Sequence, residues 1–262
     1  MSKPLVIIGS GLAGYSVARE WRRLDATTPL YIITAEDGDF YSKPLLSTAL
    51  AKQKTLDGLV LSSCDKQAKQ LNAEIITDTT VTQIDWQQQT IRYGDTELAY
   101  DKLVLAVGGE VMTAPLEGDA DVLSVNSLMD YRQLRPKLDQ CKKVAVLGAG
   151  LVGVELANDM HAAGIEVTII DPQAMPLAAL LPQALSEVVQ DAFSEAGIHW
   201  RLGCVAKVVS SCGSGYQVTL SDQQRLEVDL VISAIGIRPD TLLAKASGIA
   251  VAKGIVVDQH CL

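Results

Sequence analysis

The sequence is poor in the side chains that most often perform catalysis without a cofactor. It holds three histidines, His161, His199 and His260, and none of them forms a zinc-ligand spacing with a cysteine. It also lacks a G-x-S-x-G segment, the turn that presents the serine nucleophile of many hydrolases. We therefore expect any catalysis to depend on a bound cofactor.

The five cysteines do not form a recognisable redox centre. They are Cys64, Cys141, Cys204, Cys212 and Cys261, and no two of them make a C-x-x-C or C-x-x-x-x-C pair. This spacing predicts reduced, structural thiols.

Long apolar runs and an excess of basic residues are also missing. No stretch approaches the roughly 18 consecutive apolar residues that span a bilayer. The net charge of -9 disfavours nucleic acid and anionic membrane surfaces as partners. The apolar start at residues 5–13 is followed at once by Arg19, Glu20, Arg22 and Arg23, without a small-residue cleavage site. We therefore expect no signal peptide and a cytoplasmic protein.

The composition itself is typical of a globular α/β protein. Hydrophobic residues make up 48% and charged residues 20% of the chain, as expected when parallel strands are apolar on both faces. A length of 262 residues exceeds one typical domain. Two domains are therefore predicted.

Residues 143–158 predict a buried strand, a tight turn and a helix. The apolar run 144–147 leads into Gly148, Gly150 and Gly153, spaced as G-x-G-x-x-G, and a mostly apolar helix follows. The first glycine permits the turn, the second lets backbone N–H groups approach a pyrophosphate, and the third lets the helix pack on the strand. Asp171, at the end of the next apolar run, is placed to accept hydrogen bonds from an adenosine ribose.

The same unit occurs a second time near the N-terminus. One G-x-G-x-x-G is a weak signal, because glycine turns are common wherever a helix packs on a strand. Here Gly9, Gly11 and Gly14 repeat the pattern, and Glu36 follows the apolar strand 30–33. Two such units imply two different nucleotides, or a duplication in which one copy is idle. Because both copies keep the glycines and the acid, we favour two working sites.

Each unit is followed by a predicted three-strand meander. The strands are expected at residues 81–85, 90–93 and 98–108 in the first unit, and at 207–210, 216–220 and 226–236 in the second. The predicted fold class is therefore α/β, with two Rossmann-like dinucleotide-binding domains that each carry a β-meander.

One further segment is specific enough to suggest a family. Tyr41-Ser-Lys43-Pro44-Leu-Leu-Ser47, taken with the glycine motif through Glu155 and the Gly236-Ile-Arg-Pro239 turn, resembles the ferredoxin and rubredoxin reductases. These belong to the FAD-dependent pyridine nucleotide-disulfide oxidoreductase family, and the resemblance is strongest to the NADH:rubredoxin reductases. It covers essentially the whole chain. It implies hydride transfer from NADH to FAD, and then transfer of single electrons to a small iron protein such as rubredoxin.

The resemblance also implies domain boundaries and site residues. Residues 1–112 and 237–262 would form a discontinuous FAD-binding domain, and residues 113–236 an inserted NAD-binding domain. The implied FAD-side residues are Gly9, Gly11, Gly14, Glu36, Lys43, Pro44, Val81, Ala106 and Gly108. The implied NAD-side residues are Gly148, Gly150, Gly153, Glu155, Asp171 and Gly236.

Two of these residues would act in the reaction itself. Lys43 would place a positive charge beside the isoalloxazine and stabilise its reduced, anionic form. Glu155 would lie near the nicotinamide. The residues alone leave alternatives open, because Lys43 also suits a surface loop and Glu155 also suits the first turn of a helix as a dipole partner. Many relatives carry Arg where this chain has Lys43, and a lysine where it has Thr48.

Three other functions remain open. One is a disulfide or peroxide reductase of the same architecture, which would need a redox cysteine at the flavin. Another is the ferredoxin reductase component of an oxygenase system. The third is an NAD-binding module that cannot retain FAD. The third arises because the sequence ends at residue 262, before the family's second flavin motif, so a C-terminally truncated form is expected.

Overall fold

The computed structural model describes residues 3–262, which divide into two compact units. The first contains the described residues through Ser42, together with Val60–Glu110 and Arg238–Leu262. The second contains Lys43–Leu59 and Val111–Ile237. The sequence-based division differs, since it keeps residues 43–59 in the FAD-binding domain. The structure groups them with the second unit, where backbone N–H groups of Leu50 and Ala51 donate to the Asp159 carboxylate.

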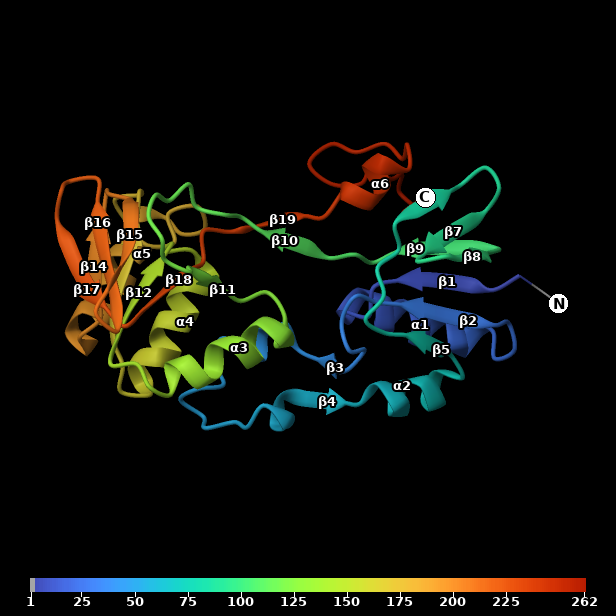
Figure 1. Ribbon diagram of the computed structural model, residues 1–262, viewed down its shortest axis with the longest axis horizontal. Helices are drawn as coiled ribbons and strands as arrows, with labels where there is room; N and C mark the ends of the chain where they lie inside the picture. Colours follow the sequence, from blue (N-terminus) through green and yellow to red (C-terminus); the bar gives the residue numbers. More distant parts are fainter. Residues whose placement is uncertain (1–2) are drawn as a thin grey trace. The chain divides into compact units, whose positions relative to one another are not determined.

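The first unit is built on a four-stranded parallel sheet in the order β5-β2-β1-β9 (Figure 1). Its strands are β1 (Leu5–Ile8), β2 (Leu30–Ile33), β5 (Glu74–Ile76) and β9 (Lys102–Leu105). Helix α1 (Leu12–Leu24) connects β1 to β2, and α2 (Cys64–Leu71) precedes β5. A short antiparallel pair, β3 (Phe40–Tyr41) with β4 (Val60–Ser62), and helix α6 (Leu242–Ala246) complete the unit.

Strand β1 is buried on both faces because different elements cover each side. Leu5 and Ile7 pack with Tyr15 and Ala18 of α1. Their neighbours Val6 and Ile8 pack toward the antiparallel sheet of β6 (Gln83–Asp85), β7 (Thr90–Tyr93) and β8 (Thr96–Ala99). This alternation explains the continuous apolar run of the strand.

The second unit repeats this plan on a five-stranded parallel sheet in the order β11-β18-β12-β13-β14. The strands are β11 (Leu123–Ser124), β18 (Leu230–Ser233), β12 (Lys143–Leu147), β13 (Glu166–Asp171) and β14 (His199–Leu202). The helices are α3 (Leu128–Leu138), α4 (Leu151–Ala162) and α5 (Gln183–Ala196). The antiparallel sheet β15 (Ala206–Cys212), β16 (Gly215–Leu220) and β17 (Arg225–Val228) packs its Val209 and Val218 against Leu147 and Val231.

Two short strands carry the chain from one unit to the other and back. They are β10 (Gly109–Val111) and β19 (Ile237–Pro239), which pair with each other. The segment Lys43–Leu59 contains only the 3-10 turns η1 (Lys43–Leu45) and η2 (Asp57–Leu59). Its place in the second unit therefore depends on bonds to other elements.

The predicted α/β class is confirmed, but the last strand of each meander is two strands. Residues 98–108 divide into the end of β8 and all of β9, and residues 226–236 divide into β17 and β18. At each break an aspartate N–H donates to the start of the central strand: Asp101 to the Pro4 carbonyl, and Asp229 to the Lys143 carbonyl. The chain thus leaves the antiparallel sheet and joins the parallel one within one or two residues.

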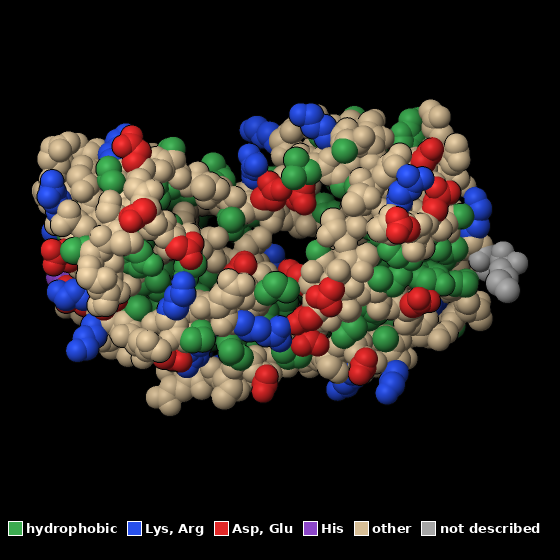
Figure 2. All heavy atoms as spheres, in the orientation of Figure 1, with side chains coloured by type: hydrophobic (Ala, Val, Ile, Leu, Met, Phe, Trp, Pro, Cys, Tyr) green, Lys and Arg blue, Asp and Glu red, His purple; other side chains and the backbone are tan. Residues whose placement is uncertain are grey.

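The surface carries both signs of charge. Figure 2 shows acidic and basic side chains interspersed over the face in view. Within residues 3–262, no helix combines the length and apolar content needed to cross a bilayer.

The central sheet of the second unit should dominate that unit's stability. Ile169 in β13 is fully buried, so Ile169→Ala should lower the free energy of unfolding by about 2–5 kcal/mol, measured by urea denaturation. The control is Val188→Ala on α5, where the side chain is 63% exposed and the expected change is below about 0.5 kcal/mol. Equal shifts in the two variants would contradict this view of the core.

Candidate functional site

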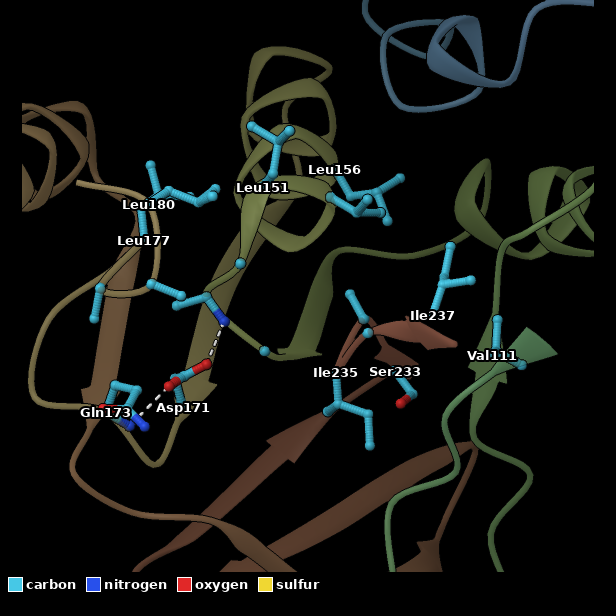
Figure 3. A pocket seen from close by; sticks show the side chains of 18 of the residues that line it. Val111, Leu151, Leu156, Asp171, Gln173, Leu177, Leu180, Ser233, Ile235 and Ile237 are labelled. Carbon is cyan, nitrogen blue, oxygen red and sulfur yellow. Dashed lines mark hydrogen bonds between the residues drawn. The ribbon is translucent and has the colours of Figure 1, made fainter. Parts of the chain in front are cut away.

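A cavity of about 370 Å³ lies at the carboxyl ends of the parallel strands of the second unit (Figure 3). The turn after β12, the loop after β13 and the residues after β18 line it, together with Val111 and Val125. Most of the lining is apolar, with Asp171, Gln173 and Ser233 as the polar side chains. Ligands of open α/β sheets bind at this end of the strands.

The three glycines of the turn after β12 have different structural tasks. Gly148 has a φ of +108°, and a Cβ there would lie 2.5 Å from the Ala234 carbonyl oxygen. A Cβ on Gly153 would overlap the Gly148 carbonyl oxygen, so α4 packs directly on the turn. A Cβ on Gly150 would meet nothing within 4 Å. Gly148 and Gly153 therefore serve packing, while Gly150 leaves the turn open to a ligand.

The start of α4 is suited to an anion. Gly150 is its N-cap residue and supplies no side-chain hydrogen bond. The N–H groups of the first turn point out of the helix, where the helix dipole favours negative charge. A diphosphate fits this position.

Asp171 braces the same turn. One carboxylate oxygen accepts from the Ala149 N–H at 2.6 Å, and the other accepts from the Gln173 N–H at 2.7 Å (Figure 3). Each oxygen retains a further lone pair, which can accept from a ribose hydroxyl. The residue can thus cap its own turn and hold a ribose at the same time.

The loop after β13 closes one side of the cavity. Leu177 has a φ of +54°, and its N–H donates to the Ala149 carbonyl at 2.9 Å. Because a leucine in the left-handed region costs on the order of 1–3 kcal/mol, this bond and the surrounding packing must hold it there. Ala149 is therefore fixed through both its N–H and its carbonyl. Leu177 and Leu180 project from this loop as part of the cavity wall.

The first unit has a glycine turn of the same geometry. Gly9 has a φ of +107°, and a Cβ there would overlap the Ala106 carbonyl. A Cβ on Gly14 would overlap the Gly9 carbonyl, whereas one on Gly11 would meet nothing within 4 Å. Helix α1 also begins without a side-chain cap. The residues of the first unit therefore fit a second dinucleotide.

The other residues expected on the FAD side lie in the same unit, with two exceptions discussed below. Glu36 follows β2 and accepts from the Tyr41 hydroxyl at 3.0 Å. Val81 is buried, 5% exposed, in the core beneath the antiparallel sheet. Ala106 donates to the Ile8 carbonyl at 2.8 Å. Gly108 has a φ of +76° and accepts from the Asp240 N–H.

Lys43, Pro44 and Glu155 lie in the second unit. The side chains of Lys43 and Pro44 are exposed, and Lys43 Nζ donates to Asn126 Oδ1 at 3.2 Å. Glu155 Oε2 accepts from Ser47 Oγ at 2.8 Å, and Glu155 is absent from the described residues that line the cavity.

Gly236 does line the cavity, with a φ of +130° and a carbonyl that accepts from the Met112 N–H at 2.9 Å.

No role was predicted from the sequence for three residues that organise this region: Ser47, Asp159 and Leu177. In the sequence, Ser47 is only the end of the segment that suggests the family. Of the other two, only Asp159 had a usable signal. It stands one helical turn after Glu155, beside the buried Met160, so an acid occupies the buried side of the helix. Nothing local distinguishes Leu177 from any other loop leucine.

Comparison with known proteins identifies a family. The family described as pyridine nucleotide-disulphide oxidoreductase matches residues 3–262. A rubredoxin-NAD(+) reductase of Alcanivorax borkumensis is 43% identical over 98% of this chain and 68% of its own length. A nitric oxide reductase FlRd-NAD(+) reductase of Escherichia coli K12 is 37% identical over 99% of this chain and 69% of its own length.

The fold has a close counterpart among solved structures. The ferredoxin reductase for the CYP199A2 system of Rhodopseudomonas palustris matches with a TM-score of 0.92 and 29% identity, over 100% of this chain and 65% of that one.

Alanine at two glycines should separate binding from folding. Gly150→Ala should leave the free energy of unfolding within about 1 kcal/mol of the parent, because its φ of -76° suits any residue. The added methyl should weaken NADH binding roughly ten- to a hundredfold, measured by titration. Gly153→Ala should instead destabilise the second unit by about 3 kcal/mol or more in urea, because its methyl meets backbone. Similar behaviour of the two variants would count against this division of tasks.

Proposed function

This chain belongs to the pyridine nucleotide-disulphide oxidoreductase family, and we propose that it is an FAD-dependent reductase that takes a hydride from NADH and passes single electrons to a small iron protein, rubredoxin in particular. The observation that carries the proposal is the repeated glycine turn. In both units the first and third glycines pack against backbone, the second is open, and an acid ends the next strand or follows it. Each unit therefore has a glycine turn that can bind the diphosphate of one dinucleotide.

The functions named for the similar proteins support this choice of function. A rubredoxin-NAD(+) reductase and a FlRd-NAD(+) reductase match nearly all of the chain. The proposed assignment places FAD on residues 1–112 and 237–262 and NADH on residues 113–236. The structure adds that residues 43–59 associate with the second unit.

The roles of individual residues follow from this assignment. Bound FAD would supply the conversion of one hydride into two single electrons. On the FAD side, Gly9, Gly11 and Gly14 would hold the pyrophosphate, Glu36 the ribose, and Lys43 and Pro44 would border the isoalloxazine. In the second unit, the turn from Gly148 to Gly153 would hold the NADH diphosphate and Asp171 its ribose. No side chain has to act as a nucleophile.

Glu155 has a more limited proposed role than the resemblance alone implies. In this chain its carboxylate accepts from Ser47. We therefore assign it to the nicotinamide side of the site as a group that orders the Lys43-containing segment.

A disulfide reductase is disfavoured by the cysteines. Burial raises the pKa of Cys64, Cys141 and Cys204, which keeps these thiols protonated and poor as nucleophiles at neutral pH. Residues 40–48, which include the Lys43 and Pro44 proposed to border the flavin, contain no cysteine. All five thiols are free, which suits the reducing cytoplasm that we propose as the compartment.

Anaerobic electron transfer tests the proposed function. The flavin-loaded chain is mixed with NADH and then with rubredoxin or a [2Fe-2S] ferredoxin, and reduction of each is followed by absorbance. Faster reduction of rubredoxin supports the proposal, and preference for the ferredoxin supports the alternative that the Rhodopseudomonas structure suggests. A purified chain without a flavin spectrum, even after addition of FAD, would leave only an NAD-binding module.

Asp171 should make the chain prefer NADH to NADPH. The additional phosphate of NADPH would lie against this carboxylate, at a cost of on the order of 1–3 kcal/mol, or roughly ten- to a hundredfold in kcat/KM. Asp171→Asn should reduce this preference. It should also weaken NADH binding, because an amide cannot accept from both Ala149 and Gln173.

The measurement is steady-state reduction of an artificial acceptor with each nicotinamide. Asp229→Asn controls for the loss of an aspartate charge at a residue that does not line the cavity. Its Oδ2 accepts both N–H groups, those of Lys142 and Lys143, so an amide oxygen can keep both bonds and the preference should stay that of the parent. The prediction is refuted if the parent has no preference, or if Asp171→Asn discriminates as strongly as the parent.

Lys43 should set the potential of the bound flavin. Removal of its charge in Lys43→Ala should lower the midpoint potential by roughly 20 mV for a loss of about 1 kcal/mol in a two-electron couple. Lys43→Arg keeps the charge and Lys207→Ala removes an exposed lysine elsewhere, so both should leave the potential close to that of the parent. A spectroelectrochemical titration measures it. An unchanged midpoint potential in Lys43→Ala would mean that Lys43 is a surface-loop residue and does not act on the flavin.

A further inference from the structure

Helix α4 carries two acids on one side, and both bind the segment Lys43–Leu59. Glu155 and Asp159 are four residues apart, so they lie one above the other on the helix. Glu155 Oε2 accepts from Ser47 Oγ at 2.8 Å. One turn later, Asp159 Oδ2 accepts from the Leu50 N–H at 2.8 Å, and Oδ1 from the Ala51 N–H at 3.0 Å.

The contact of Asp159 with this segment requires a carboxylate to be buried. The residue is only 7% exposed, and a buried carboxylate is unfavourable unless hydrogen bonds replace its hydration. Here each oxygen accepts a charge-assisted bond from one of two consecutive backbone N–H groups. The partners are 109 and 108 positions away in the sequence. The bonds therefore fix a distant segment and have no part in forming α4 itself.

Two other elements of the second unit hold the same segment. Arg135 of α3 donates from Nη1 to the Lys54 carbonyl at 2.9 Å. Asn126, just before α3, accepts from Lys43 Nζ. The segment is thus held at several points along its length, and the bond from the Leu50 N–H to Asp159 is the buried one.

We propose that Asp159 is a positioning residue for hydride transfer: it fixes Lys43–Leu59 to the helix that begins at the NADH cradle. The N-terminus of α4 lies at Gly150 in the cavity, and two turns later the same helix holds Leu50 and Ala51. The segment that contains Lys43 and Pro44 is thereby held in a fixed position relative to the helix at whose N-terminus the nicotinamide nucleotide binds. Asp159 is not among the described residues that line the cavity, so the role proposed for it is exercised through the segment. The inference rests on the proposed function, because Lys43 is the cation assigned there to the flavin.

Hydrogen exchange in the parent chain is the first part of the test. Leu50 and Ala51 lie in a turn, where exposed amides exchange fast, yet their N–H groups are bonded to a carboxylate. They should be the most protected amides between residues 46 and 53. Exchange at the rate of unprotected turn amides would overturn the proposal, whether or not any variant folds.

The second part compares Asp159→Asn with Asp229→Asn. An amide in place of Asp159 can accept from at most one of the two N–H groups while its own NH₂ faces the other, so Leu50 or Ala51 should exchange about ten- to a hundredfold faster. Asp229→Asn removes the charge of a carboxylate whose Oδ2 alone accepts two backbone N–H groups, and it should leave this segment unchanged. Equal exchange of Leu50 and Ala51 in the parent and Asp159→Asn would refute the proposal.

The third part separates positioning from a purely structural role. In flavin-loaded Asp159→Asn, the rate of flavin reduction at saturating NADH should fall about tenfold or more, because the reacting groups are less well aligned. The Kd for NADH should stay within about twofold of the parent, since the cavity lining is intact. Faster exchange with an unchanged reduction rate, or a loss of rate that follows a loss of NADH affinity, would overturn the positioning role.

The outcomes also distinguish this inference from the proposed function. If the flavin-loaded parent is reduced by NADH but no iron protein accepts its electrons, the proposed acceptor is wrong. The exchange of Leu50 and Ala51 and the rate of flavin reduction still decide the role of Asp159.

Discussion

Both units depend on a contact between a helix and the glycine turn that precedes it. In each, a helix glycine without a Cβ lies against the carbonyl of the first turn glycine, Gly14 on Gly9 and Gly153 on Gly148. Any side chain at Gly14 or Gly153 would push the helix away. Because the contact is so close, the N-terminus of the helix stands directly at the end of the central strand. A diphosphate at that point meets backbone N–H groups and the positive end of the helix dipole.

The layers around each sheet explain why the ligand ends of the strands stay accessible. Helices cover one face of the parallel sheet and a three-strand antiparallel sheet covers the other, so alternate residues of β1 are buried in two different clusters. The carboxyl ends of β12, β13 and β18 are left to the loops. The loops of the second unit are themselves braced: Asp171 and Leu177 hold Ala149 from either side. The cavity is therefore largely preformed, which lowers the ordering cost of binding.

A second constraint joins the two tasks of α4. Its first turn faces the cavity, and its later turns carry Glu155 and Asp159, which bind the segment that contains Lys43. A reaction between a nicotinamide and a flavin depends on sub-ångström alignment. An electron-transfer reductase without a catalytic nucleophile has to obtain its rate from such alignment and from the charge placed near the reacting rings. Burial of the Asp159 carboxylate costs solvation free energy, and the need to hold the Lys43-containing segment in place gives a reason for that cost.

The sequence alone determined what local chemistry can encode. The two glycine motifs, the acids after the second strands and the apolar runs predicted the duplicated α/β fold, because a tight turn and a close helix leave a position only for glycine. Features that depend on residues far away in the chain could not be predicted from the sequence. Residues 98–108 divide into two strands because Asp101 donates to Pro4, and Leu177 is left-handed because it donates to Ala149. Residues 43–59 join the second unit because a carboxylate more than a hundred positions away accepts their N–H groups. No periodicity or propensity carries that information, since each of these hydrogen bonds exists only once the tertiary structure has brought its two ends together.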